Sequence, residues 1–289
     1  MNDVLAELLI PFSYDYMLKA MWVSALVGAV CAFLSAYLML KGWSLMGDAL
    51  GHSIVPGVAA AYILGAPFAI GAFFAGILAA LGMTFVKSHT RLREDAVIGL
   101  VFTTLFALGL LMASIWPTSV SIQTIVLGNI LGISDEDVVQ VIIIAGISLA
   151  VMAFIWKDLM VTFFDESHAR SIGINTGLLK LVFFTLLSAC TVAALQTVGA
   201  CLVIAMVVTP GATAYLLTDR FGRLIVFAVA IGATTSFVGA YISYFLDGAT
   251  GGVIVSLQTL LFLAAFYMAP KHGRIASRRR SLAAGEVAA

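Results

Sequence analysis

The chain has 289 residues, of which 62% are hydrophobic and only 10% are charged, and its formal net charge is zero. Its mean hydropathy of +1.10 lies far above that of a soluble domain. The three cysteines lie scattered in apolar runs, without the paired spacing of a zinc-finger or redox motif. The composition therefore excludes an ordinary soluble domain and indicates an all-α membrane protein that crosses the bilayer several times.

Uncharged runs of about 20 residues, long enough to cross the hydrocarbon core, predict about nine membrane spans in one transmembrane domain covering residues 1–289. We expect these spans near 20–40, 44–64, 68–86, 96–115, 138–156, 178–198, 200–217, 224–246 and 252–269. Gly65 and Pro67 separate the second span from the third. The apolar stretch 118–134 is too short and too polar to count as a span, so its role and the final span count stay open.

The positions of the basic residues predict the orientation of the chain. With nine spans, 14 of the 15 lysines and arginines fall on one side, and only Lys19 falls on the other. We therefore expect the N-terminus outside the cytoplasmic membrane and the basic tail, residues 271–289, in the cytoplasm. An even number of spans is disfavoured, because it would place several of the basic residues outside.

The stretch SLMGDALGHSIVP contains Asp48 and His52. When the carboxylates and histidines of the sequence are placed relative to the nine predicted spans, these two fall inside a span. Their spacing of four places them on one face of a helix, one turn apart. An ionised side chain at the bilayer centre costs about 2.5–3.5 kcal/mol on insertion scales and usually serves a function. Carboxylate plus imidazole suits divalent manganese, iron or zinc. Two ligands are too few for such an ion, but a twofold-related subunit would supply a second pair.

Three other roles are compatible with the same spacing. Asp48 could cap the N-terminus of a helix that starts near Ser44 or Gly47. The two side chains could instead form a structural ion pair or a proton relay. Three glycines and Pro56 make an irregular helix plausible here, and broken helices are common at transport sites.

The segment 157–180, KDLMVTFFDESHARSIGINTGLLK, is the longest hydrophilic loop and is predicted to be cytoplasmic. Its middle, residues 163–173, favours a short helix that ends near a glycine. Such a helix suits docking to a soluble partner, although an ordinary interfacial helix has the same pattern. His168 beside Asp165 and Glu166 imitates a metal site, but a solvated polar face explains these residues better.

Pro210 and Gly211 interrupt a later span and are candidates for a kink, serving either packing or a hinge. The chain contains no GxxxxGK[ST], HExxH or GxSxG motif. It therefore encodes no familiar ATPase or hydrolase site, and the energy for any transport must come from another protein.

Four stretches together resemble one known family. They are KGWSLMGDALGHSIVPGVAAAYILG, KDLMVTFFDESHARSIG, AALQTVGACLVIAMVVTPGATAYLLTDRFGR and YFLDGATGGVIV. The chain is similar, from about residue 11 to residue 280, to the permease subunits of bacterial ABC importers for zinc, manganese and iron. The manganese and iron branch is the most similar.

This resemblance implies a type II-like ABC importer permease fold that works as a dimer of identical or related permeases. It implies two cytoplasmic ATP-binding subunits and a periplasmic metal-binding protein as partners, in a bacterial cytoplasmic membrane whose lipid surrounds the spans. Mn²⁺ or Fe²⁺, with Zn²⁺ as a further candidate, would be cargo rather than a resident cofactor. We expect neither enzymatic activity in this chain nor a nucleic-acid partner.

The resemblance also assigns residues. Asp48 and His52 match the family's candidate intramembrane metal ligands, in a motif where Gly51 replaces a common serine. This replacement leaves open whether Ser53 or water supplies the missing hydroxyl. The segment 163–173 matches the coupling helix that fits a groove on the ATPase. The coupling residues expected from this match are Phe164, Asp165, Glu166, Ala169, Arg170 and Gly173.

Three rival functions stay open at this stage. A secondary transporter could exchange protons for metal at Asp48 and His52. An ABC permease could carry a metal chelate such as haem or a siderophore. An intramembrane enzyme is the least favoured. The metal itself, and whether two identical or two different permeases pair, cannot be inferred from two ligands.

Overall fold

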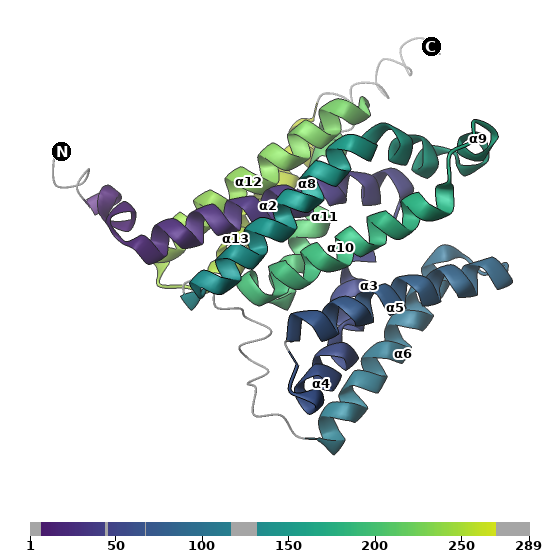
Figure 1. Cartoon of the computed structure of the whole chain (residues 1–289). Coiled ribbons are helices and arrows are strands. Elements are labelled where there is room, and N and C mark those ends of the chain that lie inside the picture. Colours follow the sequence, from purple (N-terminus) through teal and green to yellow (C-terminus); the bar gives the residue numbers. More distant parts are fainter. Residues whose placement is uncertain (1–6, 44–45, 67, 117–131, 270–289) are drawn as a thin grey trace, which may run out of the picture. The chain divides into compact units, whose positions relative to one another are not determined.

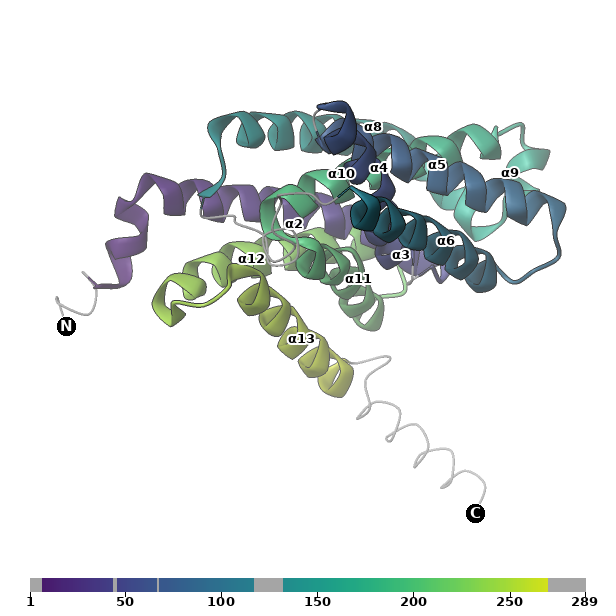
Figure 2. The same ribbon diagram turned by 90° about the horizontal axis from the view of Figure 1, so that it is seen from below.

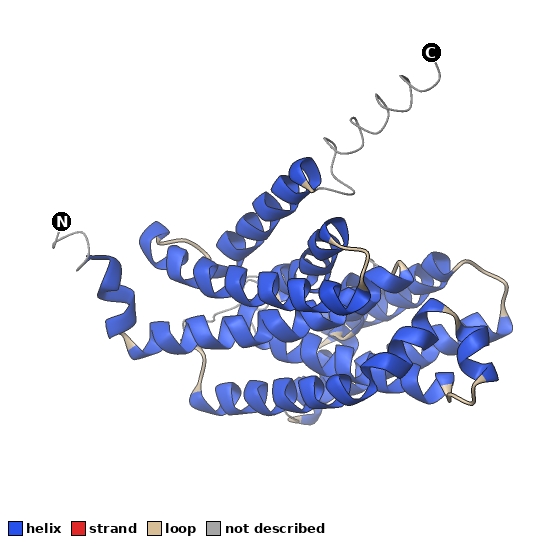
Figure 3. Cartoon of the chain, turned by 90° about the horizontal axis from the view of Figure 1, so that it is seen from above, coloured by secondary structure: helices blue, strands red, loops and turns tan. Residues whose placement is uncertain are grey.

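The structure is a computed structural model that describes residues 7–43, 46–66, 68–116 and 132–269. Within these ranges the chain forms helices and no strand, as Figure 3 shows, so the predicted all-α class is confirmed. The elements in chain order are η1 (Ile10–Ser13), α2 (Asp15–Lys41), α3 (Met46–Ser53), α4 (Val55–Leu64), α5 (Phe68–His89), α6 (Glu94–Ile115), α8 (Asp135–Phe164), α9 (Glu166–Ser171), α10 (Thr176–Val198), α11 (Ala200–Leu217), α12 (Phe221–Leu246) and α13 (Thr250–Met268).

Seven helices of the described ranges are long and apolar enough to cross a membrane, and two apolar helical stretches, Ala49–Leu64 and Leu202–Leu217, are shorter. The shorter stretches correspond to the predicted spans 44–64 and 200–217, so a count of nine full spans is not confirmed. The predicted span 138–156 belongs to the longer α8, whose 30 residues extend for about 45 Å at 1.5 Å per residue. Helix α8 therefore continues beyond a hydrocarbon core of about 30 Å. Most of the stretch 118–134 and the whole tail 271–289 lie outside the described residues.

The chain divides into two compact units, Leu40–Ile204 and Met1–Met39 with Ala205–Ala289. In the first of these, α5 contacts α4, α6 and α10, and α10 also contacts α8 (Figure 1). The boundaries between the units fall inside α2 and α11. The single domain expected from the sequence stays a prediction.

Small residues let helices of the first unit approach closely. A side chain on Gly57 of α4 would collide with the carbonyl of Gly71 in α5, and the reverse collision would follow a substitution at Gly71. Close backbone contact between small residues is how helices associate in lipid, where burial of apolar surface provides little drive. The turn that follows α4 is made by Gly65 in the left-handed conformation, with φ of 65°. The amide of Ala66 closes this turn on the carbonyl of Ala61 at 2.8 Å.

The second unit contains most of α2 and α11 together with the hairpin of α12 and α13, which lie side by side (Figure 2). The buried amide of Gln258 in α13 donates to the hydroxyl of Thr235 in α12 at 3.2 Å. Hydrogen bonds of this kind between helices are the usual role of an amide side chain in an apolar span.

Candidate functional site

The helix that carries Asp48 and His52 is broken. Helix α3 ends at Ser53 and α4 begins at Val55, with a turn at Ile54 between them. Pro56 explains the break, because proline lacks the N–H that a continuous helix would direct to the carbonyl of His52, and its ring crowds that turn. The predicted single span 44–64 is therefore two short helices, as the glycines and the proline suggested.

His52 lies on α3 beside two aromatic rings of α6. The ring centroids of His52 and Phe102 are 5.6 Å apart, and those of His52 and Phe106 are 5.2 Å apart with an edge-on arrangement. The imidazole is partly exposed rather than sealed in the core. For Asp48 the structure describes the backbone, which is helical within α3, one turn before His52. The shared face expected from the spacing therefore exists at the level of the backbone.

Gly51 and Ser53 have different surroundings. A side-chain carbon built on Gly51 meets no atom within 4 Å, so this position borders open space. Ser53, by contrast, is buried, and its hydroxyl donates to the carbonyl of Ala49 at 2.5 Å. The hydroxyl proton of Ser53 is thus used within its own helix, and whether Ser53 or water replaces the serine common at position 51 in the family stays open.

Among the residues that the structure describes, no group of three or more histidine, cysteine, aspartate or glutamate side chains could hold a metal ion. Within the described residues, His52 therefore belongs to no complete site of this kind. A complete shell for a divalent transition metal needs four or more ligands. The remaining ligands must come from water, from a second subunit or from the undescribed part of the chain.

The predicted coupling segment contains a short helix, α9, with well-formed ends. Asp165 caps its N-terminus by accepting a hydrogen bond from the amide of His168 at 3.0 Å. Gly173, with φ of 84°, ends it in the left-handed conformation, and the amide of Ile174 bonds to the carbonyl of Ala169. The prediction of a helix ending at a glycine is confirmed, but its start is corrected. Residues 163 and 164 belong to α8, because the extended backbone of Asp165 interrupts the helix.

A three-residue cluster, the Glu166 clamp, fastens α9 to the start of α10. The carboxylate of Glu166 accepts hydrogen bonds from Lys180 at 2.5 Å and from Arg170 at 2.6 Å. Partial burial acts to raise the pKa of Glu166, but the bonds and charges of Lys180 and Arg170 outweigh it, so this pKa lies below its ordinary value. Glu166 therefore stays ionised at neutral pH and holds the two cations together.

The six predicted coupling residues divide into two groups. Phe164 has 80% of its surface exposed, and Asp165, Arg170 and Gly173 are also exposed. Ala169 is completely buried and Glu166 is partly buried, so these two help to seat the helix on the chain. The coupling role of all six residues stays a prediction. The sequence interpretation missed Ile172, whose 55% exposure adds a second apolar group to the outer face.

An aromatic cluster that the sequence interpretation also missed lies between the coupling segment and α3. The ring of Trp43 stacks on Phe184 at 5.5 Å and lies 5.4 Å from Phe163, the penultimate residue of α8. The carbonyl of Trp43 accepts a hydrogen bond from the amide of Met46, the first residue of α3. All three rings are buried. The cluster thus provides a packed contact between the end of α8 and the start of the helix that carries Asp48 and His52.

Pro210 and Gly211 lie inside α11, close to Ser35 of α2. The hydroxyl of Ser35 accepts from the amide of Gly211 at 3.1 Å and donates to the carbonyl of Val208 at 3.1 Å. Polar side chains of neighbouring helices commonly satisfy backbone groups near an intramembrane proline. This contact supports a packing role for the Pro210 region, and its role as a hinge stays a prediction.

These features define a class: an all-helical, multi-span membrane protein with a histidine beside a helix break and a short helix in its longest hydrophilic loop. Residues 13–269 match the ABC 3 transport family, and the chain belongs to that family.

Two relatives support this assignment in sequence. The chain is 70% identical over 278 residues to the chelated iron transport system membrane protein YfeC of Yersinia pestis, covering 96% of this chain and 95% of that protein. It is 48% identical over 273 residues to the manganese transport system membrane protein MntB of Synechocystis sp., covering 94% and 89%. Both relatives are named as membrane proteins of transport systems.

A solved structure supports the fold. A chain of PsaBC from Streptococcus pneumoniae, determined in complex with Fab, superimposes with a TM-score of 0.82 at 33% identity, covering 93% of this chain and 97% of that one. The resemblance stated from sequence and the expected permease fold are thereby confirmed.

Proposed function

We propose that this chain is the permease subunit of an ATP-driven importer that moves Mn²⁺ or Fe²⁺ across the bacterial cytoplasmic membrane. The observation that carries the proposal is the broken helix α3–α4, where His52 is partly exposed beside the open space at Gly51, one turn from Asp48. Broken helices with polar groups at the break are typical of transport sites. The names of the relatives favour iron and manganese over zinc.

The site requires a second permease. One chain offers one carboxylate and one imidazole, and a twofold-related permease would bring a matching pair to the same ion. Four such ligands with water complete a shell that is firm enough to select a divalent cation and weak enough to release it. The second permease is either identical to this one or homologous to it, and a periplasmic metal-binding protein delivers the ion.

Two cytoplasmic ATP-binding subunits supply the energy for transport, and each of them docks on the α9 of one permease. Phe164 and Ile172 supply an exposed apolar surface for a groove on each ATPase, and the Glu166 clamp makes α9 move as one body with the start of α10. Displacement of this segment reaches α3 through the buried contacts of Trp43 with Phe163 and Phe184. ATP binding would open the site outward to accept the ion, and hydrolysis would return it toward the cytoplasm.

The orientation predicted from the basic residues agrees with this mechanism. It places α9 and the C-terminus in the cytoplasm, where ATP-binding subunits are found, and the N-terminus in the periplasm.

The decisive experiment measures metal accumulation in cells that express the whole importer, by elemental analysis after supply of free Mn²⁺ or Fe²⁺. Asp48→Ala and His52→Ala should reduce uptake to the level of cells without the importer, while the complex still assembles. His89→Ala serves as the matched control, because His89 is an exposed histidine at the end of α5. Gly51→Ser should retain uptake, since the added side chain enters open space. Normal uptake by either alanine variant of the site would refute the site assignment.

The rival functions give different results in the same cells. Uptake that needs the co-expressed ATPase and is blocked by vanadate supports the importer. Uptake that persists without the ATPase and collapses with a protonophore would identify a proton-coupled transporter. If metal accumulates only when it is supplied as a chelate, the transported substrate is a metal chelate. The name of the Yersinia pestis relative mentions chelated iron for that protein.

A further inference from the structure

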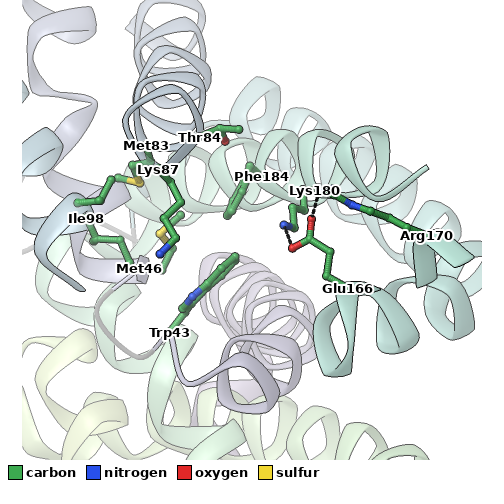
Figure 4. Close-up of a pocket in the computed structure, with 11 residues that line it drawn as sticks. Trp43, Met46, Met83, Thr84, Lys87, Ile98, Glu166, Arg170, Lys180 and Phe184 are labelled. Atoms are coloured by element: carbon green, nitrogen blue, oxygen red, sulfur yellow. Dashed lines mark hydrogen bonds and ion pairs between the residues drawn. The ribbon is translucent and has the colours of Figure 1, made fainter. Parts of the chain in front are cut away.

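A pocket of about 290 Å³ in the first unit is lined by residues of α5, α6, α9 and α10 (Figure 4). His52 is not among its described lining residues, although the first residue of α3, Met46, forms part of its wall. Its charged lining consists of Lys87 from α5, Glu166 and Arg170 from α9, and Lys180 from α10. The proposed function gives this pocket no role.

The pocket carries an excess of positive charge. Its described lining holds three cations and one carboxylate, and that carboxylate is shared between Lys180 at 2.5 Å and Arg170 at 2.6 Å. Lys87 brings the third positive charge, and its ammonium donates to the carbonyl of Leu92 at 2.9 Å. This bond uses one of the three N–H groups of the ammonium and fixes the group at the wall. A ligand that enters the pocket therefore meets a net positive charge and N–H groups that can donate hydrogen bonds.

The remaining walls are apolar. Trp43, Met83, Ile98 and Phe184 line the same space and are buried. A volume of about 290 Å³ is close to the lower limit of about 300 Å³ for small-molecule sites. The space suits the head group of an amphiphile with its first carbon atoms, and it is too small for a whole lipid.

The helices that line the pocket also carry exposed apolar side chains, which suit contact with acyl chains. Leu81 and Phe85 of α5 and Leu100 of α6 are exposed apolar side chains close in sequence to the lining residues of the same helices. The basic residues place this end of the helices at the predicted cytoplasmic interface, where anionic lipids concentrate. Basic pockets between spans on this side are known receptors for phospholipid head groups.

We propose that this pocket binds a phosphate group carried by an anionic membrane phospholipid, with Lys87 and Lys180 as its principal cations. A bound phosphate would join α5 to the Glu166 clamp and so strengthen the seating of α9. The lipid surrounding the importer would thereby act on the segment that contacts the ATPase.

The test is a binding titration of the delipidated full-length chain in detergent, followed by native mass spectrometry. Phosphatidylglycerol, phosphatidylcholine and inorganic phosphate are titrated separately. Lys87→Gln removes one cation and should weaken phosphatidylglycerol binding about fivefold, the usual effect of one basic residue at an anionic surface. Lys157→Gln is the matched control, because Lys157 is an exposed lysine at the same predicted side, outside the pocket.

A second variant fills the pocket without changing its charge. Thr84 is exposed at the wall, so Thr84→Phe should block the head group while the protein keeps its elution volume and melting temperature. Preference for phosphatidylglycerol over phosphatidylcholine that both pocket variants lose and the control keeps would support the proposal. Equal losses in Lys87→Gln and Lys157→Gln, or no loss in either pocket variant, would overturn it. Binding of inorganic phosphate that depends on Lys87, without binding of phosphatidylglycerol, would replace the lipid with a free phosphate as the source.

Discussion

The Glu166 clamp gives the sharpest prediction about how α9 is held. The variant Glu166→Gln keeps the length of the side chain and one acceptor oxygen but removes the negative charge. It leaves Lys180, whose side chain is only 22% exposed, without its carboxylate partner at 2.5 Å. The interaction free energy that Arg170 loses is smaller, because its side chain is 68% exposed and the pair is an ordinary i,i+4 helix pair.

The magnitude follows from these two contacts. A hydrogen bond to a charged group that is mostly buried contributes about 1.5–3 kcal/mol, and an exposed helical pair contributes about 0.3–0.5 kcal/mol. After allowance for solvent screening and for the oxygen that glutamine retains, we expect a loss of about 2 kcal/mol in the free energy that keeps α9 seated. This corresponds to an increase of about 30-fold in the population of the open segment.

Hydrogen exchange measured on the full-length chain tests this value. The amides of Ala169, Ile172 and Gly173 bond to carbonyls within the segment, at 3.0–3.2 Å, and should exchange faster in Glu166→Gln. Glu136→Gln is the matched control, because Glu136 is an exposed glutamate in the first turn of α8. Unchanged exchange in α9 of Glu166→Gln would refute the clamp.

The pH dependence provides a second readout of the same clamp. Because the pKa of Glu166 is lowered in the folded chain, its ionised form stabilises the seated segment at pH values above the ordinary glutamate pKa. That stabilisation is lost as the pH falls through the lowered folded-state pKa. The protection of the α9 amides, taken relative to the intrinsic exchange rate at each pH, should fall across this window in the wild type, and Glu166→Gln should lack this fall.

Three further predictions concern packing and coupling. Gly57→Ala should lower the free energy of unfolding by about 1–3 kcal/mol, because the added methyl group collides with the facing carbonyl of α5. Gly99→Ala is the control, because its added methyl group meets no atom within 4 Å. Thermal melting in detergent compares the two variants. Ser35→Ala should lower the free energy of unfolding by about 1 kcal/mol or more, because an amide and a carbonyl of α11 lose the hydroxyl of Ser35 as a partner. Ser13→Ala, at an exposed position, should melt like the wild type. Trp43→Ala should remove about 3–5 kcal/mol of packing and leave ATP hydrolysis by the assembled importer uncoupled from metal uptake; tight coupling in this variant would contradict the proposed path from α9 to α3.

Much of the architecture could be predicted because it depends on local composition. Runs of apolar residues require helices in a bilayer, since every backbone polar group must be satisfied within its own segment. The membrane class, seven of the spans, the turn at Gly65 and the glycine end of α9 follow from such runs and their interruptions. The unusual position of Asp48 and His52 is also visible in the sequence, because a charged group inside an apolar run stands out without any tertiary information.

The tertiary structure alone decided which distant residues meet. Trp43 contacts Phe163 and Phe184, and Glu166 contacts Lys180, through turns and helix packing that no local pattern encodes. A local pattern also cannot tell which face of a short helix is covered, and the burial of Ala169 is visible only in the folded chain. Burial and pairing depend on the neighbouring helices, and their identity is a property of the folded chain as a whole.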